Sequence, residues 1–199
     1  MRSFERLPYL LFLICSSTLG FSQVILDSLW KIWNNPKQSD SIRLEAMYCI
    51  AFDGYLHSQP DSAYYFSQIL FDHAKKKKNI LGMANAINTQ GGVFARKGNF
   101  TAAIKLFKQT SNLYLTGGYK RNYAKAVLNL GNIYREQGDI TAAMDCFNKG
   151  LKTFEELTDK NRIAWTYLSF TTIHISLKEY KLAQLSSKKA LAIFEQLSD

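Results

Sequence analysis

AKAVLNLGNIYREQGDITAAMDCF, residues 124–147, decides the fold of this chain, because its pattern recurs 40 residues earlier as ANAINTQGGVFARKGNFTAAIKLF, residues 84–107. The two copies align without a gap, so that Gly91 matches Gly131. A third, looser copy follows another 40 residues on. Repeats of this length are typical of stacked supersecondary units that bury their apolar faces only against one another.

The apolar periodicity within each copy is that of helices, and the breakers divide the chain into helix pairs. The expected pairs are 41–57 with 60–77, 80–97 with 100–116, 120–137 with 140–157, and 160–177 with 180–197. The sequence thus predicts an all-α protein, an α-solenoid of helix-turn-helix repeats with a 40-residue period. Its segments are an N-terminal helix and linker, 23–40, and repeats at 41–79, 80–119, 120–159 and 160–199.

The expected turns contain residues that are typical of helix ends and helix starts. Gly98-Asn99 and Gly138-Asp139 each end one helix with glycine and begin the next with an N-cap residue. Pro60 occupies the first position of a helix, where a missing N–H costs little. We therefore expect tight turns between the helices of each pair.

Small and large residues alternate at fixed offsets, which predicts close packing between helices. The small positions are Ala84, Ala103, Ala124, Ala143, Ala164 and Ala183. The large positions are Phe94, Phe107, Tyr134, Phe147 and Phe154. The doublet Gly91-Gly92, inside a helical pattern, is interpreted as a point of close helix approach and not as a phosphate loop.

The third unit resembles a tetratricopeptide repeat. The residues that carry the resemblance are Val127, Leu130, Gly131, Tyr134, Ala143 and Phe147. The preceding unit keeps most of these positions, whereas Ala51 and Thr171 replace the glycine in the first and last units, as is common in terminal repeats. The resemblance covers about 41–198. It implies a concave surface, lined by the first helix of each unit (helix A), that binds protein or peptide segments.

The N-terminus has the features of a signal peptide, residues 1–22. Arg2 and Arg6 precede an apolar run, and Gly20 and Ser22 fit a cleavage site before Gln23. A lipoprotein signal is the second interpretation, because Cys15 follows Ile14 and not a small residue. The sequence therefore predicts an exported protein, periplasmic or secreted.

The two later cysteines, Cys49 and Cys146, lie more than two units apart, which predicts separate core positions and no disulfide. His57, His73 and His174 match no metal-ligand spacing, and no catalytic arrangement has supporting context. We therefore expect no enzyme activity, no cofactor and no metal.

Charge gives little information on partners. The formal net charge is +9, but the run Lys75–Lys78 is best explained as a helix C-terminus, where cations complement the macrodipole. No basic and aromatic motif of a nucleic-acid-binding protein is present, so no nucleic acid is expected. No membrane contact is expected beyond the signal peptide unless the gene continues.

Polar residues on helix A are the candidate binding residues. They are Asn85, Asn88 and Arg96 in the second unit, Lys125, Asn129, Asn132 and Arg135 in the third, and Trp165 and Thr172 in the fourth. Amide groups both donate and accept hydrogen bonds, so they suit the backbone of an extended peptide, and the two arginines suit a carboxylate. For any single residue the alternative is a solvated helix face.

The opening Leu26-Asp27-Ser28-Leu29-Trp30 and the later Pro60-Asp61-Ser62-Ala63 resemble the exported sensor regions of Bacteroidetes-type signalling proteins. In such proteins a tetratricopeptide array precedes a histidine kinase, a DNA-binding regulator or a nucleotide cyclase. The first hypothesis is therefore a non-catalytic binding scaffold with a sensor role. The alternatives are a structural array that associates end to end, and the regulatory front part of a longer protein.

Overall fold

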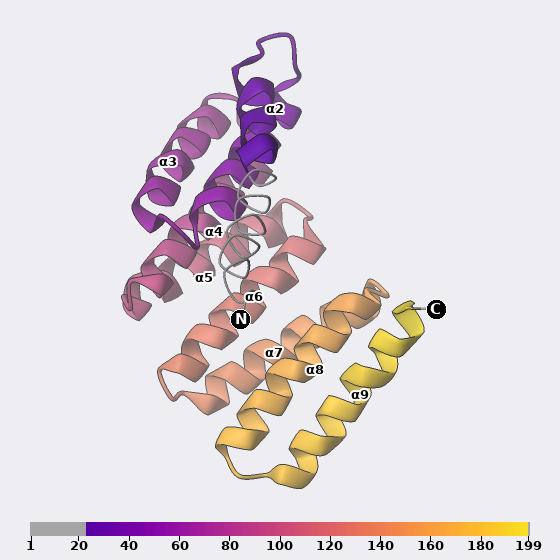
Figure 1. The fold of residues 1–199 in the computed structure, drawn as a ribbon. Coiled ribbons are helices and arrows are strands. Elements are labelled where there is room, and N and C mark those ends of the chain that lie inside the picture. The colour runs from indigo at the N-terminus through magenta and orange to yellow at the C-terminus, as the bar shows by residue number, and fades with distance from the viewer. Residues whose placement is uncertain (1–22, 199) are drawn as a thin grey trace, which may run out of the picture.

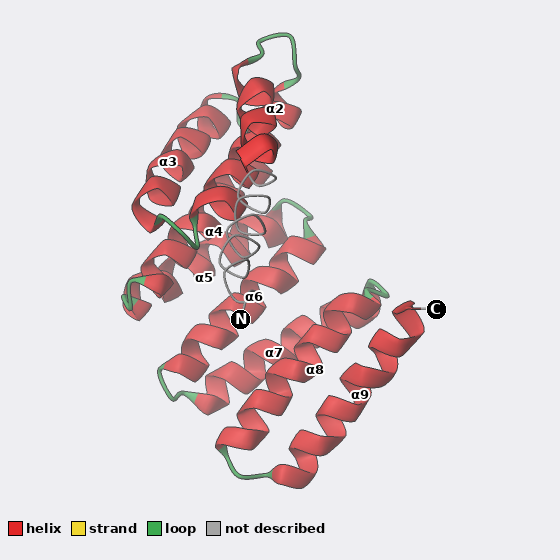
Figure 2. Ribbon diagram, in the orientation of Figure 1, coloured by secondary structure: helices red, strands yellow, loops and turns green. Residues whose placement is uncertain are grey.

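The structure is a computed structural model that describes residues 23–198, and every regular element in this range is a helix (Figures 1 and 2). The predicted signal peptide, 1–22, lies outside the described residues. Residues 23–34 form the first helix. The others are α2 (Asp40–Cys49), η1 (Ile50–Tyr55), α3 (Pro60–Lys76), α4 (Ile80–Arg96), α5 (Phe100–Thr116), α6 (Lys120–Glu136), α7 (Ile140–Glu156), α8 (Lys160–Ser176) and α9 (Tyr180–Ser198).

Consecutive helices pack against one another, and the chain winds from α2 at one end to α9 at the other (Figure 1). Helices α2 and α4 are also in contact, as are α6 and α8, so that first helices of neighbouring units share one side of the array. This arrangement confirms the predicted α-solenoid. From α3 onward, each helix begins at the residue that the repeat pattern predicted and ends within one residue of the predicted end.

The predicted helix 41–57 is the exception, because it changes at Ile50 into the π-helical segment η1. Gly54 lies in this wider segment, and a Cβ placed there would be 3.0 Å from Leu26 Cδ1 of the first helix. The wider turn and the missing side chain together let the first helix pack closely. Apolar spacing alone does not distinguish an α-helix from a helix with one π-helical turn.

The predicted pairing of small and large residues forms the core. The alanines at positions 84, 103, 124, 143 and 164 are all fully buried. A Cβ at Gly91 would lie 3.0 Å from Phe107, and one at Gly131 would lie 2.7 Å from Phe147, one unit later. In both units the glycine therefore makes room for the aromatic ring of the following helix.

Side-chain caps start most of the helices. Asn99 Oδ1 accepts a hydrogen bond from the Ala102 N–H, and Asp139 Oδ1 accepts one from the Ala142 N–H, which confirms both predicted N-caps. Pro60 is the first residue of α3, also as predicted. These caps satisfy N–H groups that have no partner inside the helix.

The turns between helices share one backbone feature at a strict interval. A residue with positive φ occurs at positions 78, 98, 118, 138, 158 and 178. Glycine occupies the middle positions of the chain, at 98, 118 and 138, whereas Lys78, Thr158 and Lys178 adopt the same left-handed conformation with φ of 54°, 51° and 60°. This conformation is unfavourable for a residue with a Cβ.

Replacing Lys78, Thr158 or Lys178 with glycine is therefore expected to raise the free energy of unfolding by about 0.5–1 kcal/mol each. The matched control is Gly98→Ala, which we expect to lower it by about 1 kcal/mol. No atom lies within 4 Å of a Cβ placed at Gly98, so the control reports the backbone alone. Urea unfolding curves measure both effects, and a stabilising Gly98→Ala substitution would contradict the explanation.

Candidate functional site

Two adjacent cavities open on the helices that come first in each unit. Their volumes are about 290 Å³ and 330 Å³, and they share Tyr48, Asn88 and Lys125. We call the two together the A-helix groove. The first cavity is lined by Glu45, Tyr48, Leu81, Asn85, Asn88, Tyr114, Arg121, Asn122 and Lys125. The second is lined by Tyr48, Phe52, Asn88, Lys125, Leu128, Asn129, Asn132, Arg162, Trp165 and Ser169.

The 40-residue register organises the groove. Glu45, Asn85, Lys125 and Trp165 occupy one equivalent position in α2, α4, α6 and α8, and all of them line the groove. The chemistry along this row therefore changes from an acid to an amide, then to a cation and an aromatic ring. Because each member differs, a ligand in the groove meets a different group at each unit.

The amides at the centre are held by neighbouring side chains. Tyr114 Oη donates to Asn85 Oδ1 at 2.6 Å, and burial raises the pKa of Tyr114, which keeps the phenol protonated as a donor. Asn129 Nδ2 donates to Asn88 Oδ1 across a longer distance, 3.5 Å. The first amide is thus fixed by a strong hydrogen bond, whereas the pair between α4 and α6 is held loosely.

Lys125 lies half-buried at the point where the two cavities meet. Burial lowers its pKa below the usual value, and the nearby cations Arg162 and Arg121 lower it further. Glu45 and Asp159 oppose this shift only in part. The middle of the groove is therefore a site of unfavourable positive charge, which an anionic group would relieve.

The two arginines beside Lys125 differ in their partners. Arg121 Nε donates to Asp159 Oδ2 at 2.7 Å, so its charge is compensated at the edge of the groove. Arg162 is half-buried on α8 and lines the second cavity. Trp165 is exposed beside it, with its ring edge to face with Phe194 of α9 at a centroid distance of 5.7 Å. A cation and an aromatic ring thus end the groove.

The structure brings together six of the nine candidate binding residues. Asn85, Asn88, Lys125, Asn129, Asn132 and Trp165 line the groove. The other three, Arg96, Arg135 and Thr172, do not line either cavity.

The three outside the groove have local partners. Arg96 donates to the His57 carbonyl at 3.0 Å, and Arg135 donates to Glu136 Oε1 at 2.7 Å. The Thr172 hydroxyl donates to the backbone of its own helix. At the 40-residue spacing of the repeat, the equivalent of Arg96 is Glu136 and not Arg135. The two arginines therefore do not occupy equivalent positions.

Two of the four asparagines that line the groove are largely buried. Asn85 and Asn88 are only 5% and 7% exposed. Asn129 and Asn132, one unit later, are half-buried and present more of their amide groups. The third unit therefore offers the more accessible hydrogen-bonding surface.

Several lining residues are not among the nine candidates, all of which lie in the second, third and fourth units. Glu45, Tyr48 and Phe52 come from the first unit, and Arg121, Asn122 and Arg162 come from the starts of α6 and α8. The signal for Glu45 and Tyr48 was present, since they precede Asn85 and Asn88 by 40 residues. These two residues were not among the candidates because the first unit resembles a tetratricopeptide repeat only weakly.

Three features of residues 23–198 bear on metal binding, membrane insertion and thiol chemistry. No cluster of three or more His, Cys, Asp and Glu residues in this range is placed to hold a metal ion. No helix in the same range is long and apolar enough to cross a membrane. Cys49 and Cys146 are far from the state of a reactive thiol, because burial raises the pKa of both, that of Cys49 to about 11.

Stacked helix pairs with a shared groove on the first helices define a helical-repeat scaffold. The chain matches the model of the Tetratricopeptide repeat family over residues 82–156 and again over 126–196. The protein belongs to this family, whose fold is that of a protein-interaction scaffold. No curated protein sequence matches the chain.

Solved structures share the fold at low sequence identity. BtubC from P. vanneervenii matches with a TM-score of 0.67 and 14% identity, covering 88% of this chain and 72% of that one. Aspartyl phosphate phosphatase F from Bacillus subtilis matches with a TM-score of 0.73 and 15% identity, covering 81% and 43%. A Rap protein complexed with competence and sporulation factor matches with a TM-score of 0.59 and 16% identity, covering 90% and 58%. At these identities the likeness extends to the fold alone.

Proposed function

We propose that the A-helix groove binds an extended protein or peptide segment that carries acidic residues. The observation that carries this proposal is the position of Lys125, half-buried where the two cavities meet, with Arg121 lining the first cavity and Arg162 lining the second. Burial and these two cations lower the pKa of Lys125. A carboxylate placed between Lys125 and Arg162 would remove this repulsion and gain charge-assisted hydrogen bonds. A neutral or basic segment would leave the repulsion in place.

Amides beside the cations suit the ligand's main chain. Asn129 and Asn132 stand three residues apart, on one face of α6, and both line the second cavity. Each amide can accept from an N–H and donate to a carbonyl, so together they fit the backbone of an extended segment without selecting its side chains. A Rap protein of similar fold is complexed with a separate factor, which supports ligand binding by such an array.

The row from Glu45 to Trp165 gives the bound segment a direction. An acidic residue of the ligand would avoid Glu45 in the first unit and lie beside Lys125 in the third. An apolar or aromatic residue next to it would contact Trp165, an exposed aromatic anchor of the kind found at binding hot spots. The proposed ligand is therefore a segment in which an acidic residue and an apolar residue are neighbours.

Selection of peptides from a random phage-displayed library on the immobilised chain tests this function. We expect enriched peptides with Asp or Glu next to an apolar residue, and weaker binding as salt rises. Selection on the Lys125→Met variant is the matched comparison and should lose the acidic preference. Equal enrichment of basic peptides on the wild-type chain would contradict the proposal.

We further propose that the scaffold is the exported sensor or interaction region of a signalling system. The support is the leader-like sequence of residues 1–22 and the resemblance to exported sensor arrays. N-terminal sequencing of the protein from its native host should begin at Gln23, in the periplasmic or secreted fraction. Recovery of the intact N-terminus from the cytosol would contradict export.

A further inference from the structure

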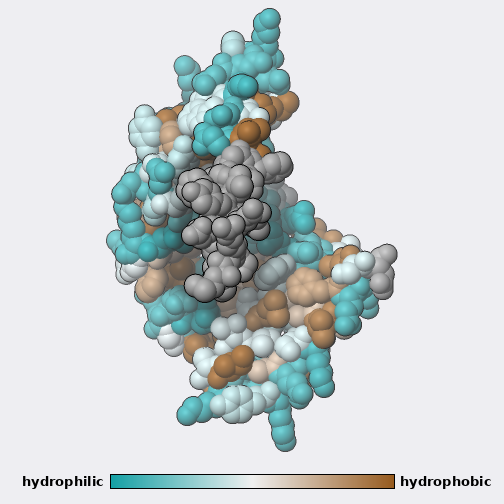
Figure 3. All heavy atoms as spheres, in the orientation of Figure 1, coloured by the Kyte–Doolittle hydropathy of each residue, from teal (hydrophilic) through white to brown (hydrophobic). Residues whose placement is uncertain are grey.

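One ion pair at the groove joins the third unit to the fourth. Arg121, in the first turn of α6, lines the first cavity, and its Nε donates to Asp159 Oδ2 at 2.7 Å. The starts of α6 and α8 lie on the same side of the array (Figure 1), and Figure 3 shows hydrophilic side chains, in teal, at the start of α6. The Asp159 side chain is 9% exposed and that of Arg121 is 60% exposed. A largely buried carboxylate therefore holds a cation of the groove lining.

The fold does not require this ion pair. At the 40-residue spacing, the positions equivalent to Arg121 and Asp159 in the preceding unit are Leu81 and Tyr119. Both of these side chains pack against one apolar cluster formed by α4, α5 and α6. The junction between the second and third units is thus apolar where the next junction has an ion pair. Because Leu81 also lines the first cavity, Arg121 places a positive charge where the preceding unit has an apolar side chain.

The helix cap does not require a carboxylate either. Asp159 Oδ1 accepts a hydrogen bond from the Arg162 N–H at the start of α8. Asn79 caps α4 in the same way, with its Oδ1 2.8 Å from the Gly82 nitrogen. An amide oxygen is as good a cap as a carboxylate oxygen. What an amide could not replace at Asp159 is the negative charge, which compensates Arg121.

This compensation sets the charge that the groove offers to a ligand. The lining carries three cations, Arg121, Lys125 and Arg162, and one carboxylate, that of Glu45. With Asp159 included, two carboxylates oppose three cations, so one positive charge is left. A single carboxylate group of a ligand balances it. A phosphate group carries a charge of about −1.5 to −2 at pH 7 and would leave an excess of negative charge in the groove.

We propose that Asp159 determines which anion the A-helix groove accepts: by compensating Arg121, it makes the groove select a carboxylate group over a phosphate group. This inference rests on the proposed binding of an acidic segment. It assigns the selection to a residue that lines neither of the two cavities. Without the charge of Asp159, the guanidinium group of Arg121 is free, and its planar set of donors suits the oxygens of a phosphate group.

Two peptides that differ in one residue test the selection. The first is an acidic peptide enriched on the wild-type chain, and the second has phosphoserine in place of its acidic residue. Fluorescence anisotropy gives the Kd of each peptide. We expect the wild-type chain to bind the acidic peptide more tightly. We expect Asp159→Asn, which keeps the cap, to bind the phosphoserine peptide about tenfold more tightly than the wild-type chain does, and in preference to the acidic one.

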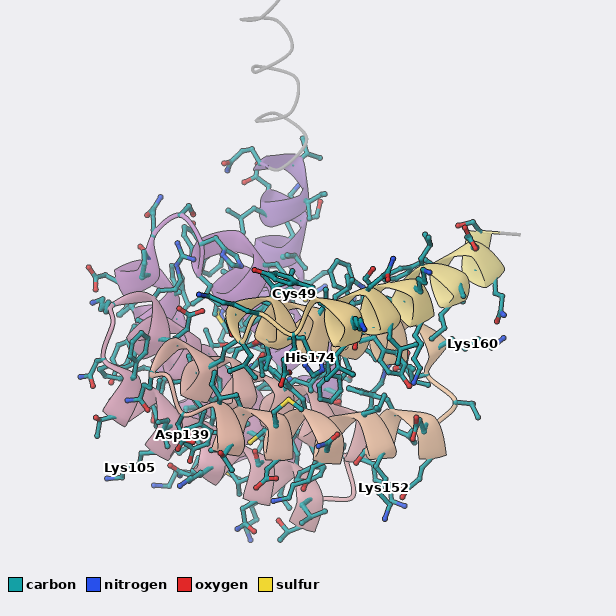
Figure 4. All side chains as sticks on the ribbon, turned by 90° about the horizontal axis from the view of Figure 1, so that it is seen from below. Cys49, Lys105, Asp139, Lys152, Lys160 and His174 are labelled. Carbon is teal, nitrogen blue, oxygen red and sulfur yellow. The ribbon has the colours of Figure 1, made fainter. Side chains whose placement is uncertain are left out.

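Asp139→Asn is the matched control. Asp139 caps α7 as Asp159 caps α8, since its Oδ1 accepts from the Ala142 N–H, but it is exposed. Figure 4 shows it at the opposite end of α7 from Lys160, the residue that follows Asp159. The control removes the same charge and keeps the same kind of cap, so the peptide preference should stay that of the wild-type chain. Circular dichroism melting curves establish that both variants stay folded.

Inorganic phosphate tests the role of Asp159 without a peptide. At pH 7 and fixed ionic strength, about 20 mM phosphate should raise the melting temperature of Asp159→Asn by about 1–2 °C. It should not change that of the wild-type chain, of Asp139→Asn, or of the double variant Arg121→Gln/Asp159→Asn, which lacks the guanidinium group.

The two experiments separate this inference from the proposed function. A wild-type chain that binds no acidic peptide would contradict the proposed function, and the phosphate experiment would still decide the role of Asp159. Three results would each overturn the inference. They are the same peptide preference in the wild-type chain and Asp159→Asn, an equal change in Asp139→Asn, and a melting temperature of Asp159→Asn that phosphate does not alter.

Discussion

Phe154→Ala is expected to lower the free energy of unfolding by about 3–5 kcal/mol. Phe154 is 0% exposed in α7, which packs between α6 and α8, so its removal leaves a cavity that the neighbouring helices cannot fill without moving. A loss of this size is a large part of the stability of a typical domain. Equilibrium unfolding in urea, followed by circular dichroism, measures it.

The repeat provides a control with the same residue and the same change. Phe194 occupies the equivalent position in α9, where it is only half-buried. Phe194→Ala should therefore cost about 1–2 kcal/mol. An equal loss in the free energy of unfolding at the two positions would contradict the explanation by burial. It would indicate that the loss depends on the position within the unit and not on whether a following helix buries the residue.

Lys125→Met should weaken the binding of a selected acidic peptide by about tenfold to a hundredfold, because it removes a charged hydrogen-bond donor from the groove. The same change should leave the melting temperature equal to or above that of the wild-type chain. Methionine keeps the apolar stem of lysine while it removes a charge that is desolvated and close to Arg162. Isothermal titration calorimetry and thermal melting measure the two quantities.

The pH dependence of stability follows from the direction of the Lys125 pKa. Its pKa in the folded chain lies below the usual value of 10.5, so between these two values the unfolded chain binds more protons. The contribution of Lys125 therefore makes stability rise as pH increases through that window, and at neutral pH its charge disfavours the folded chain. Lys125→Met should remove this part of the pH dependence.

Lys105→Met is the matched control for the groove. Lys105 lies on α5, and its side chain points outward, away from the other helices (Figure 4). The substitution changes net charge by the same amount, so a long-range effect of charge would appear in both variants. Comparable loss of binding in the two would show that Lys125 acts through net charge and not through contact with the ligand.

The repeat made the helices predictable because each 17-residue helix from α3 to α7 is followed by a short turn that contains a glycine or an N-cap residue. The groove was harder to predict. Asn85 lines the first cavity, but the hydrogen bond that it accepts comes from Tyr114, 29 residues later on α5. Arg96 and Arg135 were grouped by residue type, although the register separates them and each has a local partner. The periodicity of the sequence predicts which face of a helix a residue occupies. It does not predict which neighbouring side chain or carbonyl group forms a hydrogen bond with that residue.

The positive-φ residues at intervals of 20 also constrain how the gene can change in length. Gain or loss of one codon inside a helix would rotate every later residue of that helix by about 100°, and would turn its groove residues away from the row they belong to. Gain or loss of 40 codons between two turns would instead add or remove a whole unit and keep all remaining residues in phase. Natural variants that differ in length should therefore differ by multiples of 40 residues, and their grooves should accommodate correspondingly longer or shorter ligands.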